Sequence, residues 1–108
     1  MSDRLSAGVL VSALLRRVGD AGGFAAVQAR GDPQGGAILL VLSERGGPER
    51  LVERGIDGRG HPALIDSTPA DDLDAYWRRR RSRDPDLWVV ALDVADAERL
   101  AAEILLGY

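Results

Sequence analysis

Apolar and polar positions near the start of the chain repeat with the spacing of one helix face. Six apolar residues recur at intervals of three and four, namely Ala7, Leu10, Val11, Leu14, Leu15 and Val18. This spacing predicts an amphipathic helix, with Arg16 and Arg17 outside the apolar stripe. Gly22 and Gly23 follow, and glycine is the residue type that most readily ends a helix.

Strand-like runs come next. Phe24–Arg30 and Ala37–Arg45 are separated by a short segment rich in glycine with one proline, which suits a tight turn and predicts a hairpin. Within the second run, Ile38–Leu42 is apolar on both faces, so we expect an interior strand covered on both sides. A Gly-Gly-Pro turn then leads to a third strand, roughly Glu49–Arg54, which would complete an antiparallel meander.

The middle of the chain is predicted to be a loop followed by a helix. Gly55–Ser67 is rich in glycine and charged residues and poor in apolar ones, which is typical of a loop. Thr68 has the character of an N-cap, with Pro69 at the first helical position and Asp71 three residues after the cap. We expect this helix to continue to about Arg83, because the Asp-Pro pair that follows disfavours helical geometry.

The last third of the chain predicts a buried strand and a final helix. Leu87–Leu92 is apolar on both faces, and Asp93 or Asp96 is placed to cap the helix that follows. One face of that helix carries Ala97, Leu100, Ala101, Ile104 and Leu105. The predicted order is α-β-β-β-α-β-α, an α+β fold with helices packed on a mostly antiparallel four-stranded sheet.

Length and charge limit the classes of protein that this chain can form. Its 108 residues suffice for one domain, so we expect residues 1–108 to fold as a single domain. Fourteen basic against 17 acidic residues give a net charge of −3, which argues against a surface built throughout for nucleic acid or anionic membrane. A domain of this size buries a modest share of its surface, so an exposed apolar helix face would favour a homodimer.

Several chemistries are excluded by residue types that the chain lacks. No cysteine occurs, so disulfides, thiolate metal sites and cysteine nucleophiles are absent. All 14 basic residues are arginine, which removes Schiff-base catalysis by lysine. The acidic Asp3 and the lack of a long apolar run argue against a secretory leader and a membrane span. We therefore expect a cytoplasmic protein with no membrane partner.

Acidic residues gather near the start of the predicted second helix, where a metal site and a capping role compete. Asp66, Asp71, Asp72 and Asp74 offer the oxygen ligands that magnesium and calcium prefer. The twelve-residue calcium loop is missing, and carboxylates are common at helix starts because they face the positive end of the helix dipole. We favour capping and expect no metal. Glycine spacings that hold nucleotide phosphates are also missing, so we expect no cofactor.

The segment Tyr76–Arg83 places five arginines beside two aromatic residues. Phosphate contact with base stacking is one interpretation, and its candidate residues are Arg78, Arg79, Arg81 and Arg83. The alternative, which we favour, is a solvated helix whose acidic start and basic end match the helix dipole. In that case Trp77 is a core anchor, and Arg80 leans across the edge of the core or pairs with Asp84 or Asp86.

The lone histidine, His61, is a weaker candidate. It lies in the segment expected to be a loop, with Asp57, Ser67 and Thr68 nearby in the sequence. An imidazole with a hydroxyl and a carboxylate supports nucleophilic catalysis, so a small hydrolase is one hypothesis. No nucleophile motif is present, and Thr68 is better placed as a helix cap. We favour a surface histidine without a catalytic role.

Four sequence blocks carry a resemblance to known proteins. They are Val11–Val18, Ala21–Ala25, Arg30-Gly31-Asp32 with Gly35-Gly36-Ala37, and Arg83–Val90, which contains Asp-Pro-Asp-Leu-Trp-Val-Val. Together they resemble a small bacterial family of uncharacterised proteins, classed as a domain of unknown function, over roughly Val11 to Asp93. The resemblance implies a single-domain bacterial cytoplasmic protein, and it supplies no catalytic residue, cofactor or substrate.

The matching blocks also have structural explanations. They comprise a helix face, glycine turns, and a helix end that leads into a buried strand, in which Trp88 is expected in the core. Asp84 and Asp86 flank a proline beside the arginine-rich helix end, so ion pairs there would fix the turn between helix and strand.

The sequence therefore favours a non-catalytic α+β binding or assembly module over two alternatives. The absence of any convergent acid–base, metal or cofactor motif in so short a chain carries this preference. Its partner would be an unidentified protein or a second copy. The alternatives are weak nucleic-acid binding through the arginine-rich helix and a hydrolase that uses His61.

Overall fold

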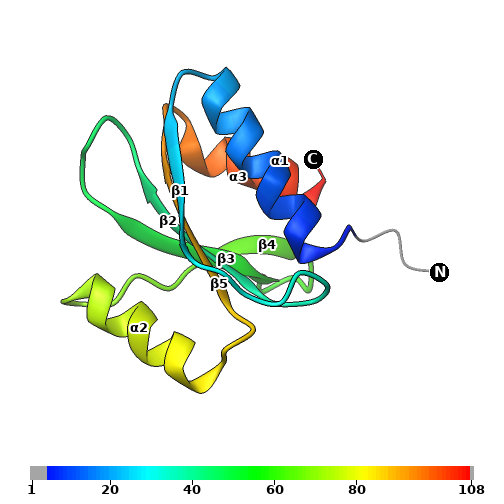
Figure 1. The fold of residues 1–108 in the computed structure, drawn as a ribbon, viewed down its shortest axis with the longest axis vertical. Coiled ribbons are helices and arrows are strands. Elements are labelled where there is room, and N and C mark those ends of the chain that lie inside the picture. Colours follow the sequence, from blue (N-terminus) through cyan, green and yellow to red (C-terminus); the bar gives the residue numbers. More distant parts are fainter. Residues whose placement is uncertain (1–4, 108) are drawn as a thin grey trace.

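A computed structural model describes residues 5–107 as one five-stranded sheet with three helices (Figure 1). The helices are α1 (Ala7–Asp20), α2 (Leu73–Arg83) and α3 (Ala97–Leu106), and the strands are β1 (Phe24–Ala29), β2 (Ile38–Ser43), β3 (Arg50–Ile56), β4 (Pro62–Asp66) and β5 (Trp88–Asp93). The order along the chain is α-β-β-β-β-α-β-α, which confirms the α+β class and adds one strand. Asp3, which argued against a leader, lies outside the described residues.

The first predicted hairpin is wrong, because β5 lies between its two strands. The strand order is β1-β5-β2-β3-β4, so β1 and β2 are not neighbours. Val90 of β5 pairs antiparallel with Val27 of β1 and parallel with Leu40 of β2, which makes the sheet mixed. The physical reason is burial: Val89 and Val90 are inaccessible to solvent, so β5 requires a neighbour on each side and a helix layer on each face.

The predicted loop Gly55–Ser67 is wrong in its second half, where β4 forms. This strand pairs antiparallel with β3, and Arg54 lies opposite Leu64. A tight turn connects the two strands, with Gly60 at a positive φ of 81°. Edge strands carry a weak apolar pattern because they bury little, and only the middle of β4 is partly buried.

Helix α2 begins later than the sequence predicted. Asp72 is its N-cap and accepts a hydrogen bond from the Ala75 N–H at 3.0 Å. Thr68 instead faces β3, where its hydroxyl accepts from the Leu51 N–H at 2.9 Å. Threonine and aspartate both cap helices well. Because the Thr68 hydroxyl is bonded to β3, the cap position falls on Asp72. For α3, the cap position falls on Asp96.

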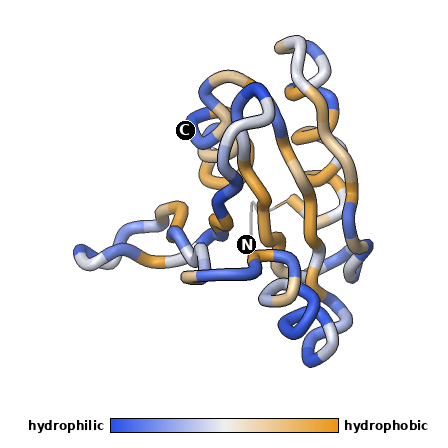
Figure 2. Tube along the Cα trace, turned by 90° about the vertical axis from the view of Figure 1, so that its left-hand side faces the viewer, coloured by the Kyte–Doolittle hydropathy of each residue, from blue (hydrophilic) through white to orange (hydrophobic). Residues whose placement is uncertain are grey.

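The two faces of the sheet are covered unequally. Helices α1 and α3 pack together on one face, where Trp88 joins a large apolar core (Figure 1). Within residues 5–107, only α2 lies on the other face, where Trp77 belongs to an apolar cluster with Leu39, Leu51 and Val89. Both tryptophans are therefore core residues, as the sequence predicted. Figure 2 shows hydrophobic colour along the central strands and hydrophilic colour towards the loops.

Among residues 5–107, no helix has the length and apolar character needed to cross a bilayer.

Candidate functional site

The arginine-rich helix α2 sends its basic side chains in different directions. Arg80 is anchored on the sheet: its Nη1 donates to Oε2 of Glu53 at 2.6 Å, and its Nη2 donates to Oε1 at 3.0 Å. The hydroxyl of Ser67 donates to the same carboxylate at 2.5 Å. Of the two alternatives for Arg80, the one in which it leans across the edge of the core agrees with the structure, and pairing with Asp84 or Asp86 is wrong, because the helix faces β3 at this position.

This ion pair shifts the pKa of both partners. The hydrogen bond from Arg80 lowers the pKa of Glu53; burial opposes that shift, and the Ser67 hydroxyl adds to it. The same hydrogen bond raises the pKa of Arg80. Both groups are charged at neutral pH, so the pair holds α2 against the sheet.

Arg81 is tied to the end of β1. Its Nη2 donates to the Arg30 carbonyl at 2.8 Å, while the Arg30 guanidinium lies over the Trp88 ring at 5.4 Å from the centroid. The Nε of Arg81 is buried and has no hydrogen-bond partner within residues 5–107. Arg81 therefore joins α2 to the sheet and has little freedom to contact a ligand.

Arg79 and Arg83 are the basic residues of α2 that remain available. Both side chains are exposed, and neither forms an ion pair in the described part of the chain. Arg78 is also exposed, but its guanidinium lies over the Trp77 ring at 4.8 Å. The five arginines thus do not form one continuous basic surface.

The acidic residues near α2 have structural tasks. Asp72 caps the helix, and Asp74 accepts from the Trp77 indole N–H at 3.3 Å. Asp66 accepts from the Thr68 N–H at 2.9 Å. Hydrogen bonding from the Thr68 side chain lowers the pKa of Asp66, and this backbone hydrogen bond adds to the shift. No group of three potential metal ligands converges anywhere in residues 5–107.

His61 is not brought together with the hydroxyl residues that a hydrolase would require. It is exposed immediately before β4, and its backbone N–H donates to the Asp57 carboxylate at 2.9 Å within the turn. Ser67 and Thr68 lie just past the other end of β4. At about 3.3 Å per residue, the strand separates them from His61 by roughly 20–23 Å.

The blocks that carried the resemblance meet at one junction. The Asp32 N–H donates to the Asp86 carbonyl at 3.0 Å, and the Trp88 indole donates to the Asp32 carbonyl at 2.8 Å. A Cβ on Gly31 or Gly36 would come within 2.2 or 2.0 Å of the Asp86 carbonyl oxygen. Glycine is therefore required at both positions, since any side chain would separate the two segments.

The expected ion pairs of Asp84 and Asp86 are wrong. The Asp84 carboxylate accepts from the Asp86 N–H at 3.1 Å, and neither carboxylate pairs with an arginine within residues 5–107. This turn is held by the Asp84 carboxylate and by main-chain contacts, which include the Leu87 N–H donating to the Asp84 carbonyl at 3.1 Å.

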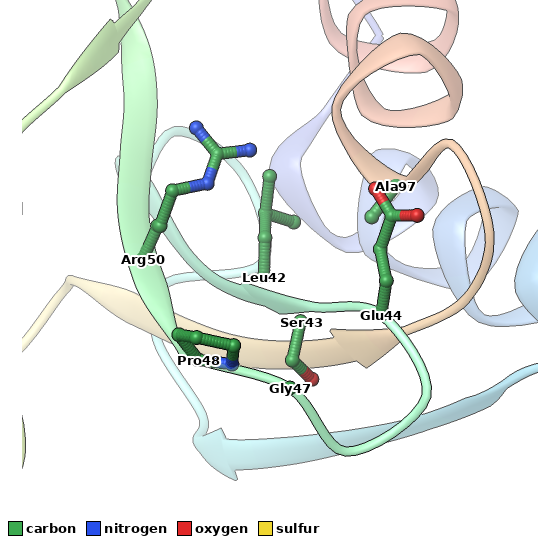
Figure 3. Close-up of a pocket in the computed structure, with 7 residues that line it drawn as sticks. All are labelled: Leu42, Ser43, Glu44, Gly47, Pro48, Arg50 and Ala97. Atoms are coloured by element: carbon green, nitrogen blue, oxygen red, sulfur yellow. The ribbon is translucent and has the colours of Figure 1, made fainter.

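An open pocket of about 280 Å³ lies between the end of β2, the start of β3 and α3. Figure 3 shows Arg50 and Glu44 on opposite sides of this pocket, with Leu42 between them. Arg50 already pairs with Glu98 at 2.8 Å and lies 3.7 Å from Asp66. The charge of Arg50 is therefore compensated by carboxylates of the chain itself. No local pattern in the sequence indicates this pocket, because its lining comes from three separate elements.

The comparison with protein families identifies the chain's relatives. Residues 5–102 match a family model described as "Protein of unknown function (DUF1491)". The chain belongs to the DUF1491 family. This result confirms the resemblance to a bacterial family of unknown function, and it assigns no activity. No protein with a curated functional description matches the chain.

Solved structures of DUF1491 relatives share the fold. A crystal structure from Caulobacter crescentus CB15 is 35% identical, covers 90% of this chain and 94% of its own, and has a TM-score of 0.76. An NMR structure from the same organism is 37% identical, with 89% and 91% coverage and a TM-score of 0.70. The solution structure of protein Atu0922 from A. tumefaciens is 33% identical, with 84% and 86% coverage and a TM-score of 0.68.

Proposed function

We propose that this DUF1491 protein is a non-catalytic binding or assembly module whose contact surface is centred on the open edge of β1. The observation that carries the proposal is the exposure of two large apolar side chains there. Phe24 is 73% exposed and Val27 is 41% exposed on a strand with a neighbour on one side only. Exposed apolar side chains beside unpaired backbone groups are the usual features of a strand-binding edge.

The charged groups of the molecule support the same proposal. Arg80 with Glu53, Arg50 with Glu98, and Arg17 with Glu103 are paired with one another. They stabilise the fold and leave no activated nucleophile or acid–base pair at a cavity. A binding role requires none of these groups.

Site-specific photo-crosslinking tests the proposal. We would replace Phe24 with p-benzoylphenylalanine, which keeps an aromatic side chain at that position, and irradiate the full chain in its native bacterial cells. The matched control carries the same group at Ile56, which is 65% exposed on β3. A discrete adduct from position 24, absent from position 56, is expected. Equal or absent crosslinking at the two positions would refute the proposed contact surface.

A second candidate function is weak nucleic-acid binding by α2. The exposure of Arg79 and Arg83, without ion pairs in residues 5–107, is the observation that favours it. Fluorescence anisotropy with labelled single-stranded RNA and DNA at low and moderate salt provides the test. The double substitution Arg79→Gln with Arg83→Gln should abolish salt-sensitive binding. Arg16→Gln with Arg59→Gln removes the same charge elsewhere and should not. No wild-type binding at low salt ends this hypothesis.

A further inference from the structure

Helix α2 is anchored by a smaller apolar face than the other two helices. Trp77 is its one buried residue, whereas α1 buries five residues and α3 buries four. Five of the eleven residues of α2 are arginine. Because most of the stability of a helix in a protein comes from packing of an amphipathic face, α2 is the most weakly held helix within residues 5–107.

The apolar core beneath α2 is also the smaller of the two cores. It comprises six buried residues, against 17 on the face that α1 and α3 cover. Figure 1 shows α2 by itself on its side of the sheet, joined to β4 and β5 by short connections. Apolar stabilisation grows with the area removed from water, so the sheet with α1 and α3 keeps most of its core without α2.

Both connections of α2 are fixed to the sheet at the end remote from the helix. On one side, the Thr68 hydroxyl is bonded to β3. On the other side, the Asp86 carbonyl accepts from the Asp32 N–H at 3.0 Å. Residues 69–72 and 84–85 lie between these fixed points and the helix, so they are the places where the chain can bend while the sheet stays intact.

Two arginines bind α2 to the sheet. Arg80 donates two hydrogen bonds to the Glu53 carboxylate, and Arg81 donates one to the Arg30 carbonyl. The indole N–H of Trp77, by contrast, donates to a carboxylate of α2 itself. Water replaces the bonds of the two arginines once the helix leaves the sheet, which keeps the cost of detachment low.

We propose that α2 is a hinged lid, which detaches from the sheet as a unit while α1, α3 and the five strands stay folded. Detachment exposes the apolar side of the sheet where Leu39, Leu51 and Val89 lie. A segment with few buried apolar contacts opens independently of global unfolding. The lid thus conceals an apolar surface that the closed structure does not offer to a partner. Nothing in this motion requires the proposed contact surface on β1.

Thiol labelling of a matched pair of cysteine variants tests the lid, because the natural chain has no cysteine. Val89 and Val90 are successive residues of β5 and are both 0% exposed, but Val89 lies in the cluster under α2 and Val90 in the cluster under α1 and α3. Each labelling rate with DTNB is divided by the unfolded fraction that urea unfolding gives for that variant. The corrected rate without urea should be at least about ten-fold higher for Val89→Cys than for Val90→Cys.

A further substitution separates detachment of α2 from local fluctuation beneath a docked helix. Adding Glu53→Gln to Val89→Cys removes the ion pair that closes the lid, and should raise the observed labelling rate about ten-fold. Adding Glu49→Gln removes an exposed carboxylate without an ion pair in the described part of the chain, and should leave the rate unchanged. Equal corrected rates for Val89→Cys and Val90→Cys overturn the lid, because position 89 is then exposed by global unfolding alone. A Val89→Cys rate that Glu53→Gln does not change overturns it too.

Hydrogen exchange on the unmodified chain makes the same comparison without a cysteine. The central amides of α2 should exchange at least about ten-fold faster than those of α1, and their rates should depend only weakly on urea below the unfolding transition. Equal protection of the two helices, with the same steep dependence on urea, overturns the proposal.

Discussion

Replacing Glu53 with glutamine should release α2 from the sheet. The Glu53 carboxylate accepts two hydrogen bonds from Arg80 and one from Ser67. Glutamine has nearly the same shape but lacks the charge, so the ion pair is lost while the packing is kept. Because α2 is the only helix on this face of the sheet in the described part of the chain, the loss acts on the second core around Trp77.

The expected loss of unfolding free energy follows from how far the Arg80–Glu53 pair is exposed to solvent. Hydrogen bonds to charged groups contribute about 1.5–3 kcal/mol, whereas solvent-exposed ion pairs contribute about 0–1 kcal/mol. The side chains of Arg80 and Glu53 are 32% and 24% exposed, which places this pair between the two classes. We therefore expect Glu53→Gln to lower the free energy of unfolding by about 1.5 kcal/mol, or the Tm by about 7 °C for a domain of this size.

The loss of stability caused by Glu53→Gln should be smaller at low pH than at neutral pH. Folding lowers the pKa of Glu53 from its ordinary value of 4.5, so the charged carboxylate stabilises the folded state above that pH. The contribution is lost as the pH falls through the lowered pKa. The difference in unfolding free energy between wild type and Glu53→Gln should be full at pH 7 and shrink below about pH 4.5.

Urea unfolding followed by tryptophan fluorescence measures this difference. Glu49→Gln removes an exposed carboxylate that forms no ion pair in the described part of the chain, and it should change stability by less than about 0.5 kcal/mol. A double-mutant cycle with Arg80→Gln should give a coupling energy of about 1 kcal/mol. Equal stability of Glu53→Gln and Glu49→Gln at pH 7 would contradict the reasoning.

Three further substitutions test other parts of the fold. Trp77→Ala empties the core under α2 and should cost about 3–5 kcal/mol in urea unfolding; a cost below 1 kcal/mol would show that α2 adds little stability. Gly36→Ala places a Cβ 2.0 Å from the Asp86 carbonyl oxygen, whereas one on Gly35 meets nothing within 4 Å. We expect a loss of about 2–3 kcal/mol only for Gly36→Ala, so equal melting temperatures would argue against the junction. His61→Ala should leave stability within about 0.5 kcal/mol, as measured by thermal unfolding.

Local patterns predicted most elements of this protein correctly. The amphipathic spacing of α1, the doubly apolar strands β2 and β5, and the Asp-Pro end of α2 are local features, because they depend on residues within one or two turns of chain. The burial of both tryptophans also followed from their neighbours in sequence. Strand β4 was missed because an edge strand buries one or two side chains and so lacks a clear apolar period.

The candidate site was only partly predictable. The arginines of α2 were evident in the sequence, but the direction of each depends on how the helix is rotated on the sheet. Glu53 is 27 residues before Arg80, so no spacing rule connects them. The open edge of β1 had a local signal, namely a run of six residues with no charge and no proline. This uncharged run indicates an open edge only once the strand order places β1 at the edge of the sheet.

The sequence by itself determined most helical and extended segments, with the exception of the edge strand β4 and the start of α2, because local periodicity and burial follow from the chemistry of neighbouring residues. The tertiary structure decided the strand order, in which β5 enters between β1 and β2. That choice depends on covering both faces of two apolar strands and on the close contact of Gly31 and Gly36 with Asp86. These contacts join segments about fifty residues apart, and the balance of such distant interactions cannot be derived from a local pattern.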